Sequence, residues 1–521
     1  MLVALHVLLA WLARVPGIFS DEAVYVALAR ALRGFEYREL FHVNLPAHRM
    51  YPPGYPAVLA VWSALGGERF DWLVLVNLAA SAAALLFIFA AIKERWGSTI
   101  ALVCLSATAF NFALITSAGW VLSEAPFMLC TAIALWAAAG TGQPETSRRA
   151  ILAGAYAIAA ALMRTAGAAV AAALGLYWLL RGQYRRAAIL AAASALTIGA
   201  WFAFTTLAPS HVPGSSYVAD AVARPADTGL GRAIAARVSN NVLYAPNLYT
   251  ALMPTIPGTR VDDALGAAIA GAAVLVGLFL IAREWPAAAA YVIVYGALLL
   301  VWPWRRERFL TPLLPWLVTA TILGIGVIVS TVRRSWNLPA MCLAAGILAL
   351  NGAADAIGAA RHRQTCQIAD DLPSSACLMP WHAAWSSFFS IVRHVREHVE
   401  PAAIFVSPAP ATLYLVTGHR SIPLTEALDR PSSEFLAFLR ERGATHVVLS
   451  DVAPFTEGKP RLSGAPLGRM VMDNCQAFRL EASFDASAYL FRVDRESGAD
   501  AAQAACHAAA DFVTRFDRTP R

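Results

Sequence analysis

The sequence predicts an α-helical polytopic membrane protein, with a small extracytoplasmic α/β domain at its C-terminal end. Of the 521 residues, 58% are hydrophobic and only 14% are charged, and the mean hydropathy is +0.55. Soluble proteins carry about 25% charged residues, so this composition is typical of a chain that lies largely in lipid. After about Gly358 the long apolar runs give way to short segments with a strand pattern. This change predicts a second, water-exposed unit.

About eleven apolar segments are candidates to cross a bilayer, which requires roughly 20 apolar helical residues. We place them near residues 2–19, 70–92, 98–116, 124–140, 150–164, 166–181, 187–208, 263–282, 286–303, 309–331 and 336–354. The fifth and sixth segments are short, so they form either one broken helix or a re-entrant pair.

The basic residues predict the orientation of the bundle. With the N-terminus in the cytoplasm, every predicted cytoplasmic loop is basic or nearly so, in agreement with the positive-inside rule. These loops contain Lys93, Arg95, Arg148, Arg149, Arg181, Arg185, Arg186, Arg283, Arg333 and Arg334. They account for much of the net charge of +7, which therefore does not indicate a nucleic-acid partner. We expect a multi-pass protein of the bacterial inner membrane, whose C-terminal domain lies outside the cytoplasm.

The predicted domains follow from this topology. Residues 1–357 form the transmembrane domain, with long outer loops at 20–69 and 209–262. The first loop contains an amphipathic helix near residues 23–32 and a short apolar helix near 55–65, which we place in the membrane interface. Residues 358–495 form the α/β domain and 496–521 a weakly patterned tail. Strands are predicted at Ala403–Ser407, His446–Ser450 and Tyr489–Val493, and a helix at Ser432–Arg442.

Cys366, Cys377, Cys475 and Cys506 fall in the predicted outer part of the chain, where disulfides are permitted. Four cysteines allow three pairings, among which the sequence alone does not choose, and we favour the local pair Cys366–Cys377. Their spacing is not that of a zinc site.

Acidic residues open two helices at the predicted outer face. Asp21 and Glu22 follow the first span, and Glu124 begins the fourth. Helix capping is the simplest alternative role, since Ser20, Asp21 and Ser123 are good N-cap residues. A carboxylate at the lipid boundary is costly, however, and is better explained if it faces a polar cavity. We therefore take Asp21, Glu22 and Glu124 as catalytic candidates.

Arg305, Arg306 and Arg308 cluster on the outer side, where arginine should be scarce. Arginine stays charged and can donate two hydrogen bonds to one phosphate, so the cluster predicts a phosphate site at the membrane surface. Arg164, at the outer end of the fifth span, is a further candidate for this site. Contact with lipid headgroups is the alternative for each of them.

His42, His48 and Arg49 lie in the first outer loop, just before Tyr51-Pro52-Pro53-Gly54-Tyr55. A histidine and an acid can hold a divalent cation, but no tight ligand spacing is present. We therefore predict no metal site and keep His42 and His48 only as weak candidates. Tyr51 and Tyr55 are expected to be interface anchors.

These motifs together resemble the GT-C superfamily of integral-membrane glycosyltransferases. The resemblance is closest to the branch of the protein O-mannosyltransferases and the lipid A aminoarabinose transferase, and it covers most of residues 1–330. It rests on four elements in the family's order: Ser20-Asp21-Glu22, Pro52-Pro53, Ser123-Glu124 and Arg308-Phe309-Leu310-Thr311-Pro312. The sequence departs from the family at one position. Just before the Pro-Pro turn, where a basic residue is often found, this chain has Tyr51, and Arg49 is the nearby substitute.

The resemblance implies transfer of a sugar from a polyprenyl-phosphate-linked donor to a lipid, glycan or protein acceptor. Membrane lipids are expected as further partners. Asp21 would act as the general base of an inverting displacement. The arginines would bind the donor phosphate, with Glu124 orienting a substrate or a cation. The main rival is a transporter or lipid flippase, although no internal repeat is visible. A second rival is a scaffold without catalytic activity, which leaves the outer arginines unexplained.

Overall fold

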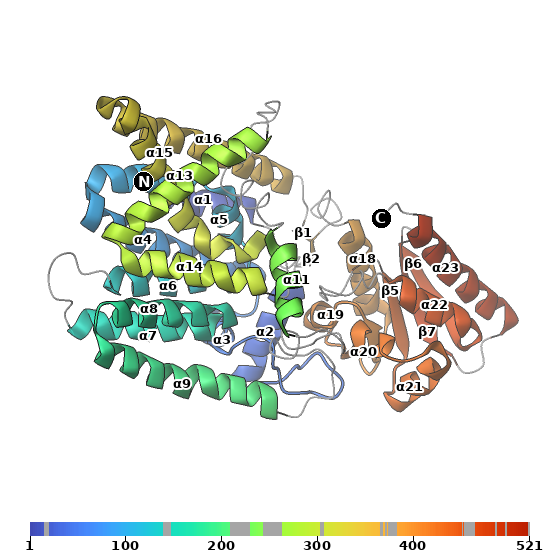
Figure 1. Cartoon of the computed structure of the whole chain (residues 1–521). Helices are drawn as coiled ribbons and strands as arrows, with labels where there is room; N and C mark the ends of the chain where they lie inside the picture. Colours follow the sequence, from blue (N-terminus) through green and yellow to red (C-terminus); the bar gives the residue numbers. More distant parts are fainter. Residues whose placement is uncertain are drawn as a thin grey trace.

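The computed structural model describes residues 1–14, 20–138, 147–208, 230–242, 263–302, 307–364, 368–369, 372–373, 383–450, 452, 464–484, 487–494 and 498–518. Two lobes are visible: a large helical bundle from α1 to α16, and a smaller lobe from α18 to α23 at one end of it (Figure 1). Helix α2 lies on the side of the bundle that meets the small lobe (Figure 1).

The bundle is built from helices joined by turns and by the first outer loop. Its elements are α1 Leu2–Ala13, α2 Ser20–Arg33, α3 Gly54–Gly66, α4 Phe70–Ala109, α5 Phe112–Ala118, α6 Glu124–Ala138, α7 Ser147–Met163, η1 Thr165–Gly167, α8 Ala168–Leu180, α9 Tyr184–Leu207, α11 Leu230–Val242, α13 Asp263–Glu284, α14 Pro286–Val301, η2 Glu307–Phe309, η3 Thr311–Leu313, α15 Leu314–Val332, η4 Arg334–Trp336 and α16 Asn337–Gln364. The η elements are 3₁₀ turns.

Each predicted span contains helix, and within the described chain four helical segments are by themselves long and apolar enough to cross a membrane. These are Phe70–Ala109, Tyr184–Leu207, Thr311–Val332 and Arg334–Arg363. The spans predicted at 70–92 and 98–116 are joined in α4, but Gly97 interrupts it with a φ of +84°. That left-handed conformation is easy only for glycine, so the two predicted spans meet at a kink. The count of eleven crossings stays a prediction.

Small residues let the helices of the bundle pack closely. A Cβ atom on Gly277 of α13 would lie 1.8 Å from the Ala320 carbonyl oxygen of α15, and one on Gly324 of α15 would lie 1.8 Å from that of Ala273. The two helices therefore cross backbone to backbone, which is a common way of packing helices in lipid. This contact anchors α15, which directly follows the 3₁₀ turns η2 and η3, and η2 carries part of the site described below.

The small lobe contains a five-stranded mixed sheet with the order β4-β3-β5-β7-β6. Its strands are β3 Phe405–Ser407, β4 Ser421–Pro423, β5 His446–Ser450, β6 Phe478–Phe484 and β7 Ala488–Val493, and a separate pair joins β1 Ile368–Ala369 to β2 Leu372–Pro373. β3 pairs in parallel with β4 and β5, whereas β7 runs antiparallel to β5 and β6. The expected α/β character of this part is confirmed.

Helices cover both faces of this sheet. α18 Ala383–His398 and α19 Pro410–Thr417 contribute to the core on one face. The other face is covered by residues of α20 Leu424–Leu428, α21 Phe435–Glu441, α22 Ala465–Asp473 and α23 Ala499–Arg518, beside the 3₁₀ turns η5 Ser432–Glu434 and η6 Cys475–Ala477. The weakly patterned tail, for which the sequence indicates a loose helix, contains α23, which packs against the sheet. A Cys475–Cys506 disulfide joins η6 to α23, while Cys366 and Cys377 lie outside the described residues.

The first outer loop joins the two lobes. Its residue Phe41 accepts a hydrogen bond from Ser421 N at 2.8 Å, and Val43 N donates to Ser421 O at 3.3 Å. The loop therefore extends the sheet beyond β4 by one short bridge at His42. Helix α2 also packs against α19 through Ala23, Ala27 and Ala411. The helix that carries Asp21 is held by both lobes.

Candidate active site

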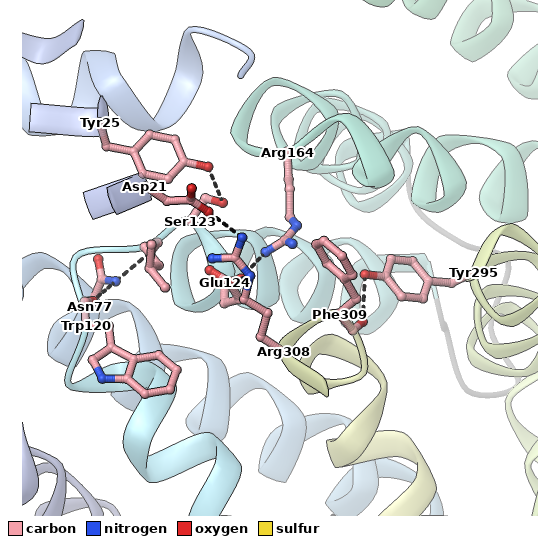
Figure 2. Close-up of polar contacts among 11 residues, drawn as sticks. Asp21, Tyr25, Asn77, Trp120, Ser123, Glu124, Arg164, Tyr295, Arg308 and Phe309 are labelled. Atoms are coloured by element: carbon pink, nitrogen blue, oxygen red, sulfur yellow. Dashed lines mark hydrogen bonds and ion pairs between the residues drawn. The ribbon is translucent and has the colours of Figure 1, made fainter. Parts of the chain in front are cut away.

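A small pocket opens where α2, α6, η1 and η2 meet. Residues from five separate parts of the chain line it: Asp21, Tyr25, Tyr51, Pro52, Glu124, Arg164, Thr165 and Arg308. Two acids and two arginines predicted from the sequence thus meet in one place: Asp21, Glu124, Arg164 and Arg308. Figure 2 shows the guanidinium groups of Arg164 and Arg308 pointing toward Glu124, with Asp21 on the other side of Arg308.

Ion pairs connect these residues into a chain. Arg308 donates a short hydrogen bond to Asp21, and its Nε lies 3.9 Å from Oε1 of Glu124. The same Glu124 oxygen lies 2.5 Å from Nη1 of Arg164. The Glu124 and Asp21 side chains are only 2% and 7% exposed, so each buried carboxylate has a guanidinium beside it. Two acids and two arginines balance in charge, which is what burial of such groups requires.

The electrostatics keep Arg308 charged. Burial acts to lower the pKa of its guanidinium, but the neighbouring charges of Asp21 and Glu124 raise that pKa well above its ordinary value. A cation that stays charged while mostly buried is suited to bind an anion such as a phosphate.

Phe309 places both arginines. Its ring is buried, and the guanidinium carbons of Arg164 and Arg308 lie 5.0 Å and 5.6 Å from the ring centroid, within the range of cation–π attraction. Its carbonyl oxygen accepts a hydrogen bond from the Tyr295 hydroxyl at 3.1 Å (Figure 2). The aromatic residue after Arg308 is therefore a positioning group that fixes η2 against α14.

The segment before α6 is fixed by buried polar side chains. Asn77 of α4 donates to the carbonyl oxygens of Trp120 and Leu122 at 2.5 Å and 2.6 Å (Figure 2). Oε1 of Glu22 accepts from Val121 N at 2.8 Å, and Glu22 is fully buried. Glu22 is not among the residues that line the pocket. Its contact with Val121 holds α2 to the turn that carries Glu124.

Two tyrosines form a wall of the pocket. The Tyr25 and Tyr51 ring centroids are 4.6 Å apart, and the Tyr25 hydroxyl lies 3.0 Å from Ser123 Oγ. Tyr51 and Tyr55 were expected to be interface anchors, but both are buried, at 7% and 0% exposure. The expectation is wrong because Tyr55 donates to Asn77 at 2.9 Å inside the bundle. Sequence patterning did not separate an interfacial tyrosine from one that packs on a neighbouring helix.

Gly54 explains how the Pro-Pro turn reaches the pocket. A Cβ atom at Gly54 would lie 2.6 Å from the carbonyl oxygen of Leu162, near the end of α7. Only glycine fits this close approach, which brings Pro52 beside Arg164.

The remaining predicted residues lie apart from this pocket. Arg305 and Arg306 fall outside the described residues. Arg49 donates a short hydrogen bond from Nε to the carbonyl oxygen of Thr205 at the end of α9 and is not among the pocket-lining residues. Its proposed role as a phosphate ligand stays a prediction.

The two loop histidines bind carboxylates of the protein. His42 Nε2 lies 3.1 Å from Glu426 Oε2 of the small lobe, and His48 Nδ1 lies 2.9 Å from Glu39 Oε1. Over the residues that the structure describes, no three histidine, cysteine or acidic side chains are grouped as a metal site would require. His48 therefore has its carboxylate partner within the loop, and His42 has its partner in the small lobe.

The sequence matches no protein-family model and no curated protein. The fold, however, is similar to that of ArnT from Cupriavidus metallidurans. Its apo structure superposes with a TM-score of 0.61 at 13% identity, over 94% of this chain and 97% of ArnT. The structure of ArnT bound to undecaprenyl phosphate gives a TM-score of 0.59 at 12% identity, with the same coverage.

A second similar structure is the oligosaccharyltransferase from Archaeoglobus fulgidus. It gives a TM-score of 0.52 at 13% identity, over 86% of this chain and 67% of that protein. ArnT is a lipid A aminoarabinose transferase, and both proteins belong to the GT-C superfamily. The resemblance inferred from the sequence motifs is thus confirmed for the fold.

Proposed function

We propose that this chain is a glycosyltransferase that transfers a sugar from a polyprenyl-phosphate donor to an acceptor on the outer face of the membrane. One observation carries the proposal: two buried acids and two buried arginines converge on one pocket, and Asp21, Glu124 and Arg308 belong to the motifs on which the sequence resemblance rests. The fold shared with ArnT and the oligosaccharyltransferase supports the same reaction class.

The arginines are suited to the donor phosphate. Arg308 and Arg164 are balanced here by Asp21 and Glu124. An incoming phosphate competes for the same guanidinium groups, because it accepts charge-assisted hydrogen bonds in the same geometry as a carboxylate. Donor binding would therefore draw Arg308 away from Asp21 and free the carboxylate for chemistry. The undecaprenyl phosphate bound in the similar ArnT structure supports a polyprenyl phosphate as the lipid part.

Asp21 is suited to be the general base. Its carboxylate lines the pocket, whereas that of Glu22 bonds to the Val121 amide. The acceptor hydroxyl would lose its proton to Asp21 while its oxygen bonds to the anomeric carbon. The bond from that carbon to the phosphate oxygen breaks at the same time, and the arginines stabilise the departing polyprenyl phosphate. Attack from the face opposite the phosphate inverts the anomeric carbon. Glu124 would keep Arg164 and Arg308 aligned.

The test is a transfer assay with purified full-length protein in lipid nanodiscs. A panel of polyprenyl-phosphate sugars with labelled sugar is incubated with lipid, glycan and peptide acceptors, and release of polyprenyl phosphate is measured. Donor-dependent release that requires an acceptor supports the proposal. Movement of the intact lipid between leaflets with no cleavage would instead make the chain a flippase, and the proposal would be wrong.

A further inference from the structure

The backbone of Tyr51 is held from both sides by side chains of the first outer loop. Its N–H donates to Nε2 of His48 at 3.0 Å, and its carbonyl oxygen accepts from the Tyr37 hydroxyl at 2.6 Å. Tyr51 precedes Pro52, and a residue before proline has few backbone conformations available to it. Fixing both of its peptide groups therefore fixes the direction of its side chain, which forms a wall of the pocket.

The loop that supplies these bonds has a regular structure. An antiparallel bridge joins Arg38 to Ala47, and His48 N donates to Tyr37 O at 3.0 Å. The tip of this loop, near Phe41, bonds to β4 of the small lobe, and its base leads to Tyr51. One continuous hydrogen-bonded segment therefore runs from the small lobe to the pocket wall.

The contacts of His48 determine which nitrogen carries the ring proton. Nε2 accepts from a backbone N–H, so it must carry a lone pair toward Tyr51. The hydrogen then lies on Nδ1, which faces the Glu39 carboxylate at 2.9 Å. Glu39 selects this tautomer, because a carboxylate accepts a hydrogen bond and donates none when ionised. His48 is only 3% exposed, so water does not readily replace either contact.

We propose that Tyr37, Glu39 and His48 are positioning residues that fix Tyr51 as the wall of the donor pocket. Glu39 sets the tautomer of His48, His48 and Tyr37 clamp the Tyr51 peptide groups, and the Tyr51 ring is thereby held on Tyr25. The ring pair then forms a rigid aromatic surface beside the arginines, which suits the apolar face of a sugar. This inference rests on the proposed glycosyl transfer for its effect on activity, and on the hydrogen bonds alone for its effect on the loop.

A matched pair of variants separates the two contacts of His48. In His48→Asn the amide reaches the position of Nδ1 and keeps the Glu39 contact, but no acceptor reaches Tyr51 N. In His48→Gln the amide oxygen reaches the position of Nε2 and can accept from Tyr51 N. His398→Asn is the control, since His398 is an exposed histidine of α18 in the small lobe.

The first measurement is steady-state transfer by the full chain. His48→Asn should lower kcat/KM by about tenfold to a hundredfold, the scale expected when a positioning group is misplaced by about 1 Å. His48→Gln and His398→Asn should stay near wild type. A double-mutant cycle with Tyr51→Ala then asks whether His48 acts through Tyr51. If it does, adding His48→Asn to Tyr51→Ala costs no further activity. Losses that multiply would overturn the proposal.

The second measurement is amide hydrogen exchange of the peptide that contains Tyr51, which does not depend on activity. Exchange should speed up in His48→Asn and remain slow in His48→Gln. Unchanged exchange in His48→Asn would refute the proposed fixing of the Tyr51 backbone by His48, whatever the transfer assay shows. If the wild type transfers no sugar while the exchange pattern is as expected, the proposed function fails and the clamp remains. The two failures are therefore distinguishable.

Discussion

Two clusters of polar residues near the outer end of the bundle differ in what their side chains bind. One group, the pocket cluster, consists of Asp21, Glu124, Arg164 and Arg308 and faces the open space of the pocket. The other, the loop cluster, consists of Glu39, His42, His48 and Arg49. Both clusters are mostly buried and both combine acids with bases.

The two clusters differ in the groups that their side chains contact. The ion pairs of the pocket cluster are made between side chains that also border the pocket, so a ligand can replace one partner with another. In the loop cluster, His48 binds Tyr51 N, Arg49 binds Thr205 O and His42 binds Glu426 of the other lobe. These partners belong to fixed backbone or to a separate packed element. Side-chain type alone therefore does not separate a binding residue from a supporting one, whereas an exchangeable partner at a cavity does.

The largest effect is expected from Asp21→Asn in the pocket cluster. Asparagine keeps the shape and the capping ability of aspartate, so the protein should still fold, but loss of the buried charge opposite Arg308 should lower its thermal midpoint. It cannot accept the acceptor proton, and loss of a general base costs about a hundredfold to ten-thousandfold in rate. Turnover is measured with the donor that the wild type uses best.

Glu124→Gln identifies the base if the assignment to Asp21 is wrong. Near-normal turnover of Asp21→Asn together with an inactive Glu124→Gln would move the general base to Glu124. If both variants stay active on an authentic donor, the pocket cluster is structural and the mechanism fails.

The next effect is on donor use. Arg308→Ala removes a charge-assisted contact worth about 1.5–3 kcal/mol, so kcat/KM for the donor should fall by roughly tenfold to a hundredfold. Arg49→Ala is the matched variant from the loop cluster, because its Nε donates to Thr205 O and not to a pocket group. If Arg49 supports the fold and does not bind the phosphate, its loss should alter the thermal midpoint more than donor efficiency. A larger loss of donor efficiency in Arg49→Ala than in Arg308→Ala would contradict the comparison.

Much of this architecture could be predicted because the relevant signals are local. The apolar runs, the Pro-Pro turn and the strands β3, β5 and β7 are visible in short windows of sequence. β4 was not predicted, since it has only three residues and ends at Pro423. β6 was not predicted either, although its alternation of apolar residues with Arg479, Glu481 and Ser483 is the pattern of a half-buried strand.

The site was predictable in its charged members and not in its supporting ones. Asp21, Glu124 and Arg308 stand out as charges beside apolar runs. A charge in such a place costs free energy unless it pairs with another charge or faces a polar cavity. Asn77, Tyr25, Tyr51 and Tyr295 carry no such signal. Tyrosine and asparagine are common near helix ends, and only the three-dimensional packing shows that their polar atoms meet. The pairing of His42 with Glu426 joins residues of two lobes, so no local pattern contains it.

A smaller, purely structural effect is expected for Glu22. Glu22→Ala leaves the buried Val121 N–H without this acceptor, which should cost about 1–3 kcal/mol of stability. Glu22→Gln retains an acceptor oxygen and should be milder. Thermal unfolding of both variants in nanodiscs measures the difference. A Glu22→Gln variant that is fully stable yet inactive would place Glu22 in the chemistry and enlarge the pocket cluster.

Removal of divalent metal ions is expected to leave the rate of sugar transfer unchanged. Both ring nitrogens of His48 are engaged, by Glu39 and by Tyr51 N. Those of His42 are engaged as well, by Glu426 and by Asn44 N. A metal would have to break these contacts and then find oxygen ligands in the pocket, where Asp21 and Glu124 already pair with guanidinium groups. Transfer is measured after exhaustive treatment with a chelator, and again after adding back zinc, magnesium or manganese. Activity that is lost with the chelator and restored by one of these ions would show that the loop or pocket cluster binds a cation, and the division between the two clusters would have to be redrawn around it.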